Sequence, residues 1–362
     1  MQINHGAHGG RTVVGMHNGA RVVNTGRHGG YVQRAYVTRG GHSYYSRTYY
    51  RNGHYYSGVY RGYYYHGYNY YGYYPGAWYG AGFYGWAYNP WASPVVWGVG
   101  AWGWGGPWWG AYAGWWNPYP VYAGPAFWLT DYIIAQQLQA AYAAQQETAS
   151  EPQAGDPPPP APASGQVALT PEVKQAIADE VKAQLASQQA QVGQGGGGGG
   201  QAPAPAPAGN GEVPPALDPA RRTFVVDTAL SVVSNGQECG LTSGDVVTRL
   251  TDNPDADNMV NASVSASKNG DCASGQTIAV KVDDLQEMQN HFAEQLNNGL
   301  GELAKKQGTG GMPKSPDAST KPSDVPPPPP DTTAGQTLQN QEQQADQTEA
   351  QVKQEVGSSG GQ

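Results

Sequence analysis

Turn-forming residue pairs recur at a nearly constant interval along the first 65 residues. Asn18-Gly19, Gly29-Gly30, Gly40-Gly41 and Asn52-Gly53 follow one another at spacings of 11, 11 and 12 residues. These pairs tolerate the positive φ angles of type I′ turns, and the segments between them are rich in Val, Thr and Tyr, which favour strands. The pattern predicts an antiparallel β-meander with strands near residues 11–17, 20–28, 31–39, 42–51 and 54–64.

The turns also predict which residues of the meander face one another. Tyr36 is expected opposite Tyr45, and Val37 opposite Tyr44. Because Tyr and Arg fall on both faces, we expect either a ribbon with two adhesive faces or an ordinary small sheet packed on its own aromatic residues. The pairs expected about the last turn are Arg51 with His54, Tyr50 with Tyr55, Tyr49 with Tyr56 and Tyr45 with Tyr60.

No period fits residues 67–125, a tract of Gly, Trp, Tyr and Pro without acidic or basic residues. We expect irregular or multiple conformations there, held by aromatic stacking. The uncharged run Trp91–Trp116 is not expected to cross a membrane, because its Gly and Pro residues would leave backbone groups unpaired in lipid. The residues expected to stack or to mediate self-association are Tyr49, Tyr50, Tyr55, Tyr56, Trp102, Trp104, Trp108, Trp109, Trp115 and Trp116.

Apolar residues at helical spacing predict two isolated helices after this tract. Thr130 is the expected cap of the first helix, with Asp131 in its first turn. Thr170 caps the second helix, and Pro171 takes its first helical position. The narrow apolar stripe of the second helix favours either pairing, within the chain or with another copy, or a solvated linker helix. The expected segments are a helix at 126–147, a Pro-rich linker at 148–168, an amphipathic helix at 169–192 and a Gly/Ala-Pro linker at 193–220.

Residues 221–306 have the pattern of a small all-β barrel followed by a long helix. Asn235-Gly236 and Asn269-Gly270 are turn signals between runs of β-branched residues. The helix is predicted to begin at Asp283, which would cap it. Residues 307–362, with five consecutive Pro and a Gln/Glu-rich end, are predicted to be a disordered tail. The expected strands are 224–227, 230–234, 246–250, 259–265 and 277–282.

Part of this all-β segment is similar to a known fold. Ala229-Leu230, the run Leu241–Val247, Gly275 and Val280–Asp284 together resemble an SH3-like barrel over residues 224–285. Peptide-binding SH3 domains grip polyproline helices with a shelf of Tyr and Trp, but residues 221–306 contain neither. We therefore expect a structural or docking role, and no SH3-type binding of the Pro-rich stretches of the chain itself.

A second resemblance lies in the aromatic tract. The fragment Ala101-Trp102-Gly103-Trp104 resembles the YxWGxW-type repeats of uncharacterised bacterial exported proteins rich in Gly, Tyr and Trp. It departs from that repeat because no Tyr stands two positions before Trp102 and the second Trp comes one position early. The resemblance implies an extracytoplasmic or cell-surface location and no known chemistry.

Charge divides the chain into two parts. Residues 1–130 contain eight Arg and no Asp, Glu or Lys, whereas the remainder contains 12 basic and 28 acidic residues. Such asymmetry predicts that the basic part binds an anionic polymer or a cell-envelope component, or that the two parts attract one another. The expected anion or partner contacts are Arg11, Arg21, Arg27, Arg34, Arg39, Arg47, Arg51 and Arg61.

The two cysteines bear on the compartment. In an exported protein, Cys239 and Cys272 are expected to form a structural disulfide, whereas in a cytosolic protein they would be buried thiols. The first ten residues lack the apolar core of a secretion signal peptide. We therefore expect either that the protein does not use that export route or that its coding region starts further upstream.

No residue pattern indicates catalysis, a cofactor or a specific metal site. The seven His of the basic part are irregularly spaced and lack a nearby Cys or carboxylate, and Gly195–Gly200 lacks the strand and the Lys of a nucleotide-binding loop. We therefore expect a non-enzymatic, exported surface or matrix protein that adheres and self-associates. Arg interleaved with Tyr, as in Arg47–Arg51, supports a second interpretation, an Arg/Tyr-rich protein that binds nucleic acid or forms condensates.

Overall fold

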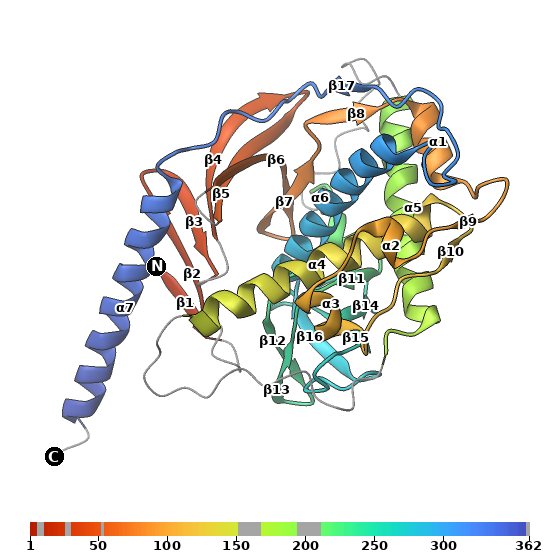
Figure 1. The fold of residues 1–362 in the computed structure, drawn as a ribbon. Coiled ribbons are helices and arrows are strands. Elements are labelled where there is room, and N and C mark those ends of the chain that lie inside the picture. Colours follow the sequence, from red (N-terminus) through yellow and green to blue (C-terminus); the bar gives the residue numbers. More distant parts are fainter. Residues whose placement is uncertain (6–10, 26–29, 52–53, 151–167, 194–210, 360–362) are drawn as a thin grey trace. The chain divides into compact units, whose positions relative to one another are not determined.

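The computed structural model describes residues 1–362 except 6–10, 26–29, 52–53, 151–167, 194–210 and 360–362 (Figure 1). The chain divides into two compact units. The first unit joins Met1–Gly62 to Val325–Gln362, and the second unit is Tyr63–Asp324. The first unit is therefore assembled from two segments that lie far apart in the sequence.

The predicted meander is present as an antiparallel sheet of seven strands, which follow one another in chain order. The sheet has one strand before the predicted set and one after it, and the later strand continues the Tyr-rich alternation beyond residue 66. The division between the two units falls within the sixth strand. The strands are β1 (Gln2–His5), β2 (Arg11–His17), β3 (Ala20–Asn24), β4 (Gly30–Arg39), β5 (His42–Arg51), β6 (His54–Tyr65) and β7 (Tyr68–Tyr74).

The register between β5 and β6 is the predicted one, whereas the register between β4 and β5 differs at one point. Tyr45 pairs with Ala35 and not with Tyr36, as predicted, while Val37 lies opposite Tyr44 as expected. Tyr36 is the extra residue of a β-bulge, a local irregularity that turn positions in the sequence do not reveal. The confirmed pairs are Arg51 with His54, Tyr50 with Tyr55, Tyr49 with Tyr56 and Tyr45 with Tyr60.

The prediction of a disordered tail at 307–362 is wrong. In the first unit, helix α7 (Ala334–Ser359) packs along β2–β5 (Figure 1). In the second unit, β17 (Thr320–Pro322) pairs with β8 (Ala77–Tyr79). The apolar stripe of α7 is narrow, so the polar composition of the segment concealed the helix. The buried apolar residues of α7 are Ala334, Leu338 and Ala345.

The two helices predicted after the aromatic tract are present, but they are not isolated. Helix α4 packs on α5 and also contacts α1 and α6. Gly299 of α6 lies so close to α4 that a Cβ there would come within 2.9 Å of the Leu129 and Tyr132 side chains. These four helices of the second unit are α1 (Ala81–Tyr88), α4 (Pro125–Ser150), α5 (Pro171–Gly193) and α6 (Val282–Lys306).

The predicted helix starts differ in their outcome. Thr170 caps α5 as expected, since its Oγ1 accepts a hydrogen bond from the Val173 N–H at 3.4 Å. Helix α4 begins at Pro125, so Thr130 is not its cap and instead donates to the Ala126 carbonyl within the helix. Helix α6 begins at Val282 rather than Asp283, with no side-chain cap.

Residues 67–125 contain several short elements around an aromatic core, where an irregular tract was expected. Trp115, Trp116 and Trp128 are at most 1% exposed. Helix α4 and other helices of the second unit complete this core, so the tract takes its arrangement from residues outside itself. Besides β7, β8 and α1, its elements are β9 (Val95–Val96), α2 (Val99–Trp102), α3 (Pro107–Tyr112) and β10 (Val121–Tyr122).

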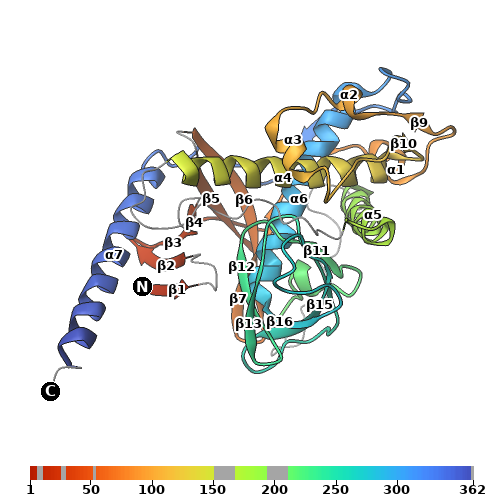
Figure 2. The same ribbon diagram turned by 60° about the horizontal axis from the view of Figure 1, so that its bottom comes forward.

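The all-β segment forms a six-stranded, barrel-like antiparallel sheet, with α6 along it (Figure 2). The predicted strands are present, together with one the sequence did not indicate, β13. A disulfide joins Cys239 on this additional strand to Cys272, with their Cα atoms 5.2 Å apart. In sheet order the strands are β11 (Thr223–Val225), β14 (Val246–Arg249), β15 (Met259–Ala266), β16 (Thr277–Lys281), β12 (Leu230–Ser234) and β13 (Gln237–Leu241).

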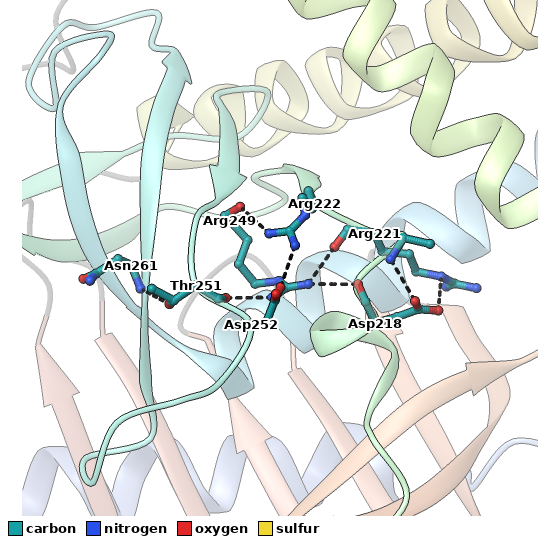
Figure 3. Close-up of polar contacts among 8 residues, drawn as sticks. Asp218, Arg221, Arg222, Arg249, Thr251, Asp252 and Asn261 are labelled. Carbon is teal, nitrogen blue, oxygen red and sulfur yellow. Dashed lines mark hydrogen bonds and ion pairs between the residues drawn. The ribbon is translucent and has the colours of Figure 1, made fainter.

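One buried arginine ties the chain before this sheet to the end of β14 (Figure 3). Arg249, at the end of β14, is 1% exposed. Its Nη2 donates to the carbonyl oxygens of Asp218 (2.8 Å) and Arg221 (3.3 Å), and its Nη1 donates to Thr251 O (2.7 Å) and to the Asp252 carboxylate (3.0 Å). Both terminal nitrogens of the guanidinium are thus bound within the fold, which agrees with a structural role for this residue.

Candidate functional site: the sheet face under helix α7

Two of the predicted anion-contact arginines lie on one face of the sheet. Cross-strand partners share a face, and so do alternate residues along a strand. Val22, Val32 and Thr48 are register partners on β3, β4 and β5. Arg34 lies two residues beyond Val32, and Arg11 on β2 belongs to the same alternation. We call this the α7 face, because α7 packs against it.

Arg11 contacts three carboxylates of α7. Its Nη2 lies 3.3 Å from Glu342 Oε1, and its Nη1 contacts Asp346 and lies 3.5 Å from Glu349 Oε1. The three acids follow one another at helical spacing, so they share one side of α7. The hydrogen bond to Asp346 is the main reason that the pKa of the Arg11 guanidinium lies above its ordinary value.

Arg34 contacts Asp331, which lies three residues before the start of α7. Its Nε donates to Asp331 Oδ2 at 3.1 Å, while Asp331 also accepts hydrogen bonds from the backbone and hydroxyl of Thr333. The backbone N–H of Asp331 donates to Thr48 Oγ1 at 2.9 Å. Burial opposes ionisation of Asp331, but the bonds from Thr333 and Arg34 outweigh it and hold the pKa of this carboxyl below its usual range.

Between these two arginines the helix and the sheet are joined by uncharged groups. Asn24 Nδ2 donates to Leu338 O at 3.2 Å, and Gln341 Nε2 donates to Val22 O at 3.0 Å. Gly335 lies flat against Tyr50, so a Cβ there would come within 3.2 Å of the ring. The apolar cluster at the centre is small and consists of Ala20, Val22, Val32, Ala334 and Leu338.

The opposite face holds an arginine that does not reach solvent. Arg47 is fully buried, with its guanidinium carbon 4.1 Å from the ring centre of Tyr31 and 4.0 Å from that of Tyr60. Its Nε donates to Gln33 Oε1 at 2.6 Å. Stacking between two tyrosines stabilises the sheet itself, so Arg47 is placed as a structural residue.

The remaining predicted arginines whose side chains the structure describes lie on three different strands of the sheet. Arg21 Nη1 donates to Tyr31 OH at 3.5 Å, and Arg61 Nη2 lies 2.8 Å from a ring nitrogen of His42. Arg39 is exposed at the end of β4. Arg27 and the side chain of Arg51 lie outside the described residues.

The four predicted tyrosines divide between packing and exposure. The Tyr50 and Tyr55 ring centres lie 4.9 Å apart, and Tyr49 contacts Tyr60 through hydroxyls 2.9 Å apart. Tyr56 is 55% exposed. Of this group, Tyr56 is thus the residue most accessible to a partner.

The six predicted tryptophans belong to one cluster in the second unit. Trp102 stacks on Trp104 with ring centres 4.0 Å apart. Three of the six are buried and support the fold, whereas three are half-buried at the edge of the cluster. The buried residues are Trp102, Trp115 and Trp116, and the half-buried residues are Trp104, Trp108 and Trp109.

A buried ion pair that no sequence pattern indicated lies beside this cluster. Lys174 Nζ lies 2.7 Å from Asp131 Oδ1, and Asp131 also accepts hydrogen bonds from Trp116 Nε1 and Tyr122 OH. Burial lowers the pKa of Lys174, although Asp131 opposes this effect. Both carboxylate oxygens are occupied, so the pair is part of the core. Its only signal in the sequence is the placement of each charge within an apolar stripe.

The acids of α7 were also missed. Their spacing of four and three residues, together with the charge asymmetry of the chain, is the signal that could have paired them with the basic sheet. Among the described residues, no three His, Cys, Asp or Glu side chains are grouped so as to hold a metal ion. Within the same part of the chain, no helix combines the length and apolarity needed to cross a membrane. His8 and His28 lie outside the described residues.

Comparisons with known proteins identified no relative of this chain. No protein-family model matches the chain, and neither a curated protein nor a solved structure matches it.

Proposed function

We propose that the protein is a non-enzymatic, exported structural protein of a cell surface or matrix, which adheres and self-associates through its N-terminal sheet. The observation that carries this proposal is the contact of Arg11 with three carboxylates of one helix. Charge-assisted hydrogen bonds of this kind favour an acidic surface over a neutral one. The α7 face therefore has the chemistry of a surface that binds acidic groups.

The second unit supports a structural rather than a catalytic role. Asp131 and Lys174 pair with each other in the core, as do Asp245 and Lys268, whose charged groups lie 3.3 Å apart. These buried charges are used to hold elements together. The disulfide between Cys239 and Cys272 supports folding in an oxidising compartment, which is the environment of an exported protein.

Exposed aromatic residues support self-association. Tyr36 and Tyr56 are 37% and 55% exposed on the sheet, and half-buried tryptophans lie at the edge of the aromatic cluster. Aromatic rings that combine an apolar face with a polar edge are enriched where proteins meet one another.

Cell fractionation and sedimentation test this proposal. We expect the protein in the envelope or extracellular fraction, with faster migration on non-reducing gels and a sedimentation coefficient that rises with concentration. A wholly cytosolic protein with two free thiols would overturn it. Binding of the full chain to single-stranded nucleic acid, with an affinity that falls steeply with salt, would instead support the nucleic-acid interpretation.

A further inference from the structure

Helix α7 belongs to the first unit by packing but is separated from it by sequence. In the sequence, the whole second unit, Tyr63–Asp324, lies between Met1–Gly62 of the first unit and residues 325–359. We infer that residues 325–359 also dock on the α7 face of a second copy, so that copies associate by exchanging this segment. This inference rests on the proposed self-association and names the surface and the partner segment through which it occurs.

The α7 face is specific for this segment. Asn24 donates to the Leu338 carbonyl, Gln341 donates to the Val22 carbonyl, and Gly335 lies against Tyr50. An anionic polymer could satisfy the charge of Arg11, but it would supply none of these groups. The occupant that fits the whole surface is therefore residues 325–359, whether from the same copy or from another.

The docked segment is held by contacts that can open. The side chains of Glu342 and Asp346 are 38% and 60% exposed, and ion pairs that reach solvent contribute little and are screened by salt. The apolar contact rests on one leucine and two alanines of α7. A disulfide to the sheet or burial in a large core would prevent exchange. The disulfide of the chain lies outside residues 325–359, and the core under α7 is small.

Exchange between copies forms the same contacts that exist within one copy. The ratio of exchanged to unexchanged copies therefore depends on protein concentration. Exchange becomes favourable when the protein concentration approaches the effective concentration of the tethered segment within one copy, which is on the order of millimolar. Reciprocal exchange gives a closed dimer, and one-way exchange gives an open chain of copies. A protein crowded at a surface or in a matrix reaches the concentrations at which such assemblies form.

A charge exchange between two full-length variants tests the inference. The first variant carries Arg11→Glu, and the second carries Glu342→Lys, Asp346→Lys and Glu349→Lys. Within each variant the sheet and α7 have like charges. In the mixture, the α7 of opposite charge to each sheet belongs to the other variant, so ion pairs form only between the two variants. We expect the mixture to associate about ten-fold more tightly than either variant alone, in sedimentation or energy transfer between labels.

A matched control keeps the contacting acids intact. Gln339→Lys, Gln343→Lys and Gln347→Lys add three lysines to the exposed side of α7. This variant retains its own Arg11 contacts, so it should not associate with the Arg11→Glu variant. Circular dichroism and the intact disulfide verify that all three variants are folded.

The outcomes separate this inference from the proposed function. If the wild-type chain self-associates but the mixture shows no gain, exchange is overturned and self-association stands. If the wild-type chain remains monomeric at millimolar concentration and the mixture shows no gain, both are overturned. If the wild-type chain associates only after polyphosphate is added, an anionic polymer bridges the copies and the exchange is overturned.

Discussion

Charged side chains are used in opposite settings in the two units. In the first unit, Arg11 and Arg34 join a sheet to a separate segment through carboxylates that reach solvent. In the second unit, Asp131 and Lys174 face each other in a core of aromatic rings, with side chains 0% and 6% exposed. Charges in pairs that reach solvent can be rehydrated when a pair opens, whereas opening the buried pair would leave two charges without water.

The energetic consequence of this contrast is large. Removing one partner of a buried ion pair destabilises a protein by about 3–5 kcal/mol, whereas an exposed pair contributes about 0–1 kcal/mol. The second unit is therefore suited to a fixed scaffold. The first unit is suited to contacts that respond to salt, concentration and competing partners.

The largest expected effect is that of Asp131→Asn. The amide cannot balance the charge of Lys174, which is buried with it, so the free energy of unfolding should fall by about 3–5 kcal/mol. Urea denaturation followed by tryptophan fluorescence measures the change, since the cluster beside Asp131 contains the reporting rings.

A double variant sharpens this prediction. Asp131→Leu combined with Lys174→Met removes both charges, so it should recover a large part of the stability lost by Asp131→Asn. A loss as large in the double variant as in the single variant would mean that the hydrogen bonds of Asp131, and not its charge, hold this part of the core.

Loss of the disulfide should have a comparable but smaller effect. Cys239 and Cys272 are 33 residues apart. A disulfide that closes a loop of this length lowers the entropy of the unfolded chain and so stabilises the folded state by about 3–4 kcal/mol. Replacing both cysteines with alanine should lower the midpoint of denaturation. A reducing agent should not change the midpoint of this variant, which has no disulfide to reduce. If the variant and the oxidised wild type denature at the same midpoint, the disulfide has no stabilising role.

The next prediction concerns the pH dependence of the second unit. Glu180 of α5 is 3% exposed, and burial raises its pKa from 4.5 to about 7 although Arg221 opposes the shift. Because the folded pKa lies above the unfolded one, the stabilising contribution is complete below about pH 4.5 and is lost as pH rises through about 7.

Glu180→Gln should therefore match the wild type at about pH 4 and exceed its stability at about pH 9 by up to about 3 kcal/mol. Unfolding free energies measured across this range test the prediction. Asp179→Asn, a change at an exposed acid of the same helix, is the control and should leave the pH profile unchanged. Parallel profiles for wild type and Glu180→Gln would contradict the assignment.

The sequence predicted structure where contacts are local. The turn pairs of the meander determine the register of β5 and β6, because a two-residue turn leaves little freedom to the strands it joins. The bulge at Tyr36 was missed, since one inserted residue changes the spacing of the turns by a single position, no more than the difference between the spacings of 11 and 12 in the sequence.

The sequence was less informative where partners are distant. The buried charge of Asp131 is balanced by Lys174, and the Trp115 carbonyl is bound by the N–H of Leu169, so no local window contains both groups. Helix α7 was missed for a related reason. Its stripe of Ala334, Leu338 and Ala345 has little apolarity of its own and is recognisable only against the sheet.

The smallest expected effect concerns the partly exposed ion pairs of Arg11 in the first unit. Arg11→Gln removes the contact with Glu342, Asp346 and Glu349, so α7 should lose about 1 kcal/mol of docking free energy at low salt. Hydrogen exchange of the α7 backbone measures this loss as about five-fold faster exchange. At about 1 M salt the variant and the wild type should exchange at similar rates, because screening removes the same contribution from the wild type.

Arg39→Gln, at an exposed arginine of β4, is the control and should not alter α7. An effect of Arg11→Gln that persists undiminished in high salt would show that Arg11 holds the helix by packing, and the contrast between the two units would then be one of degree.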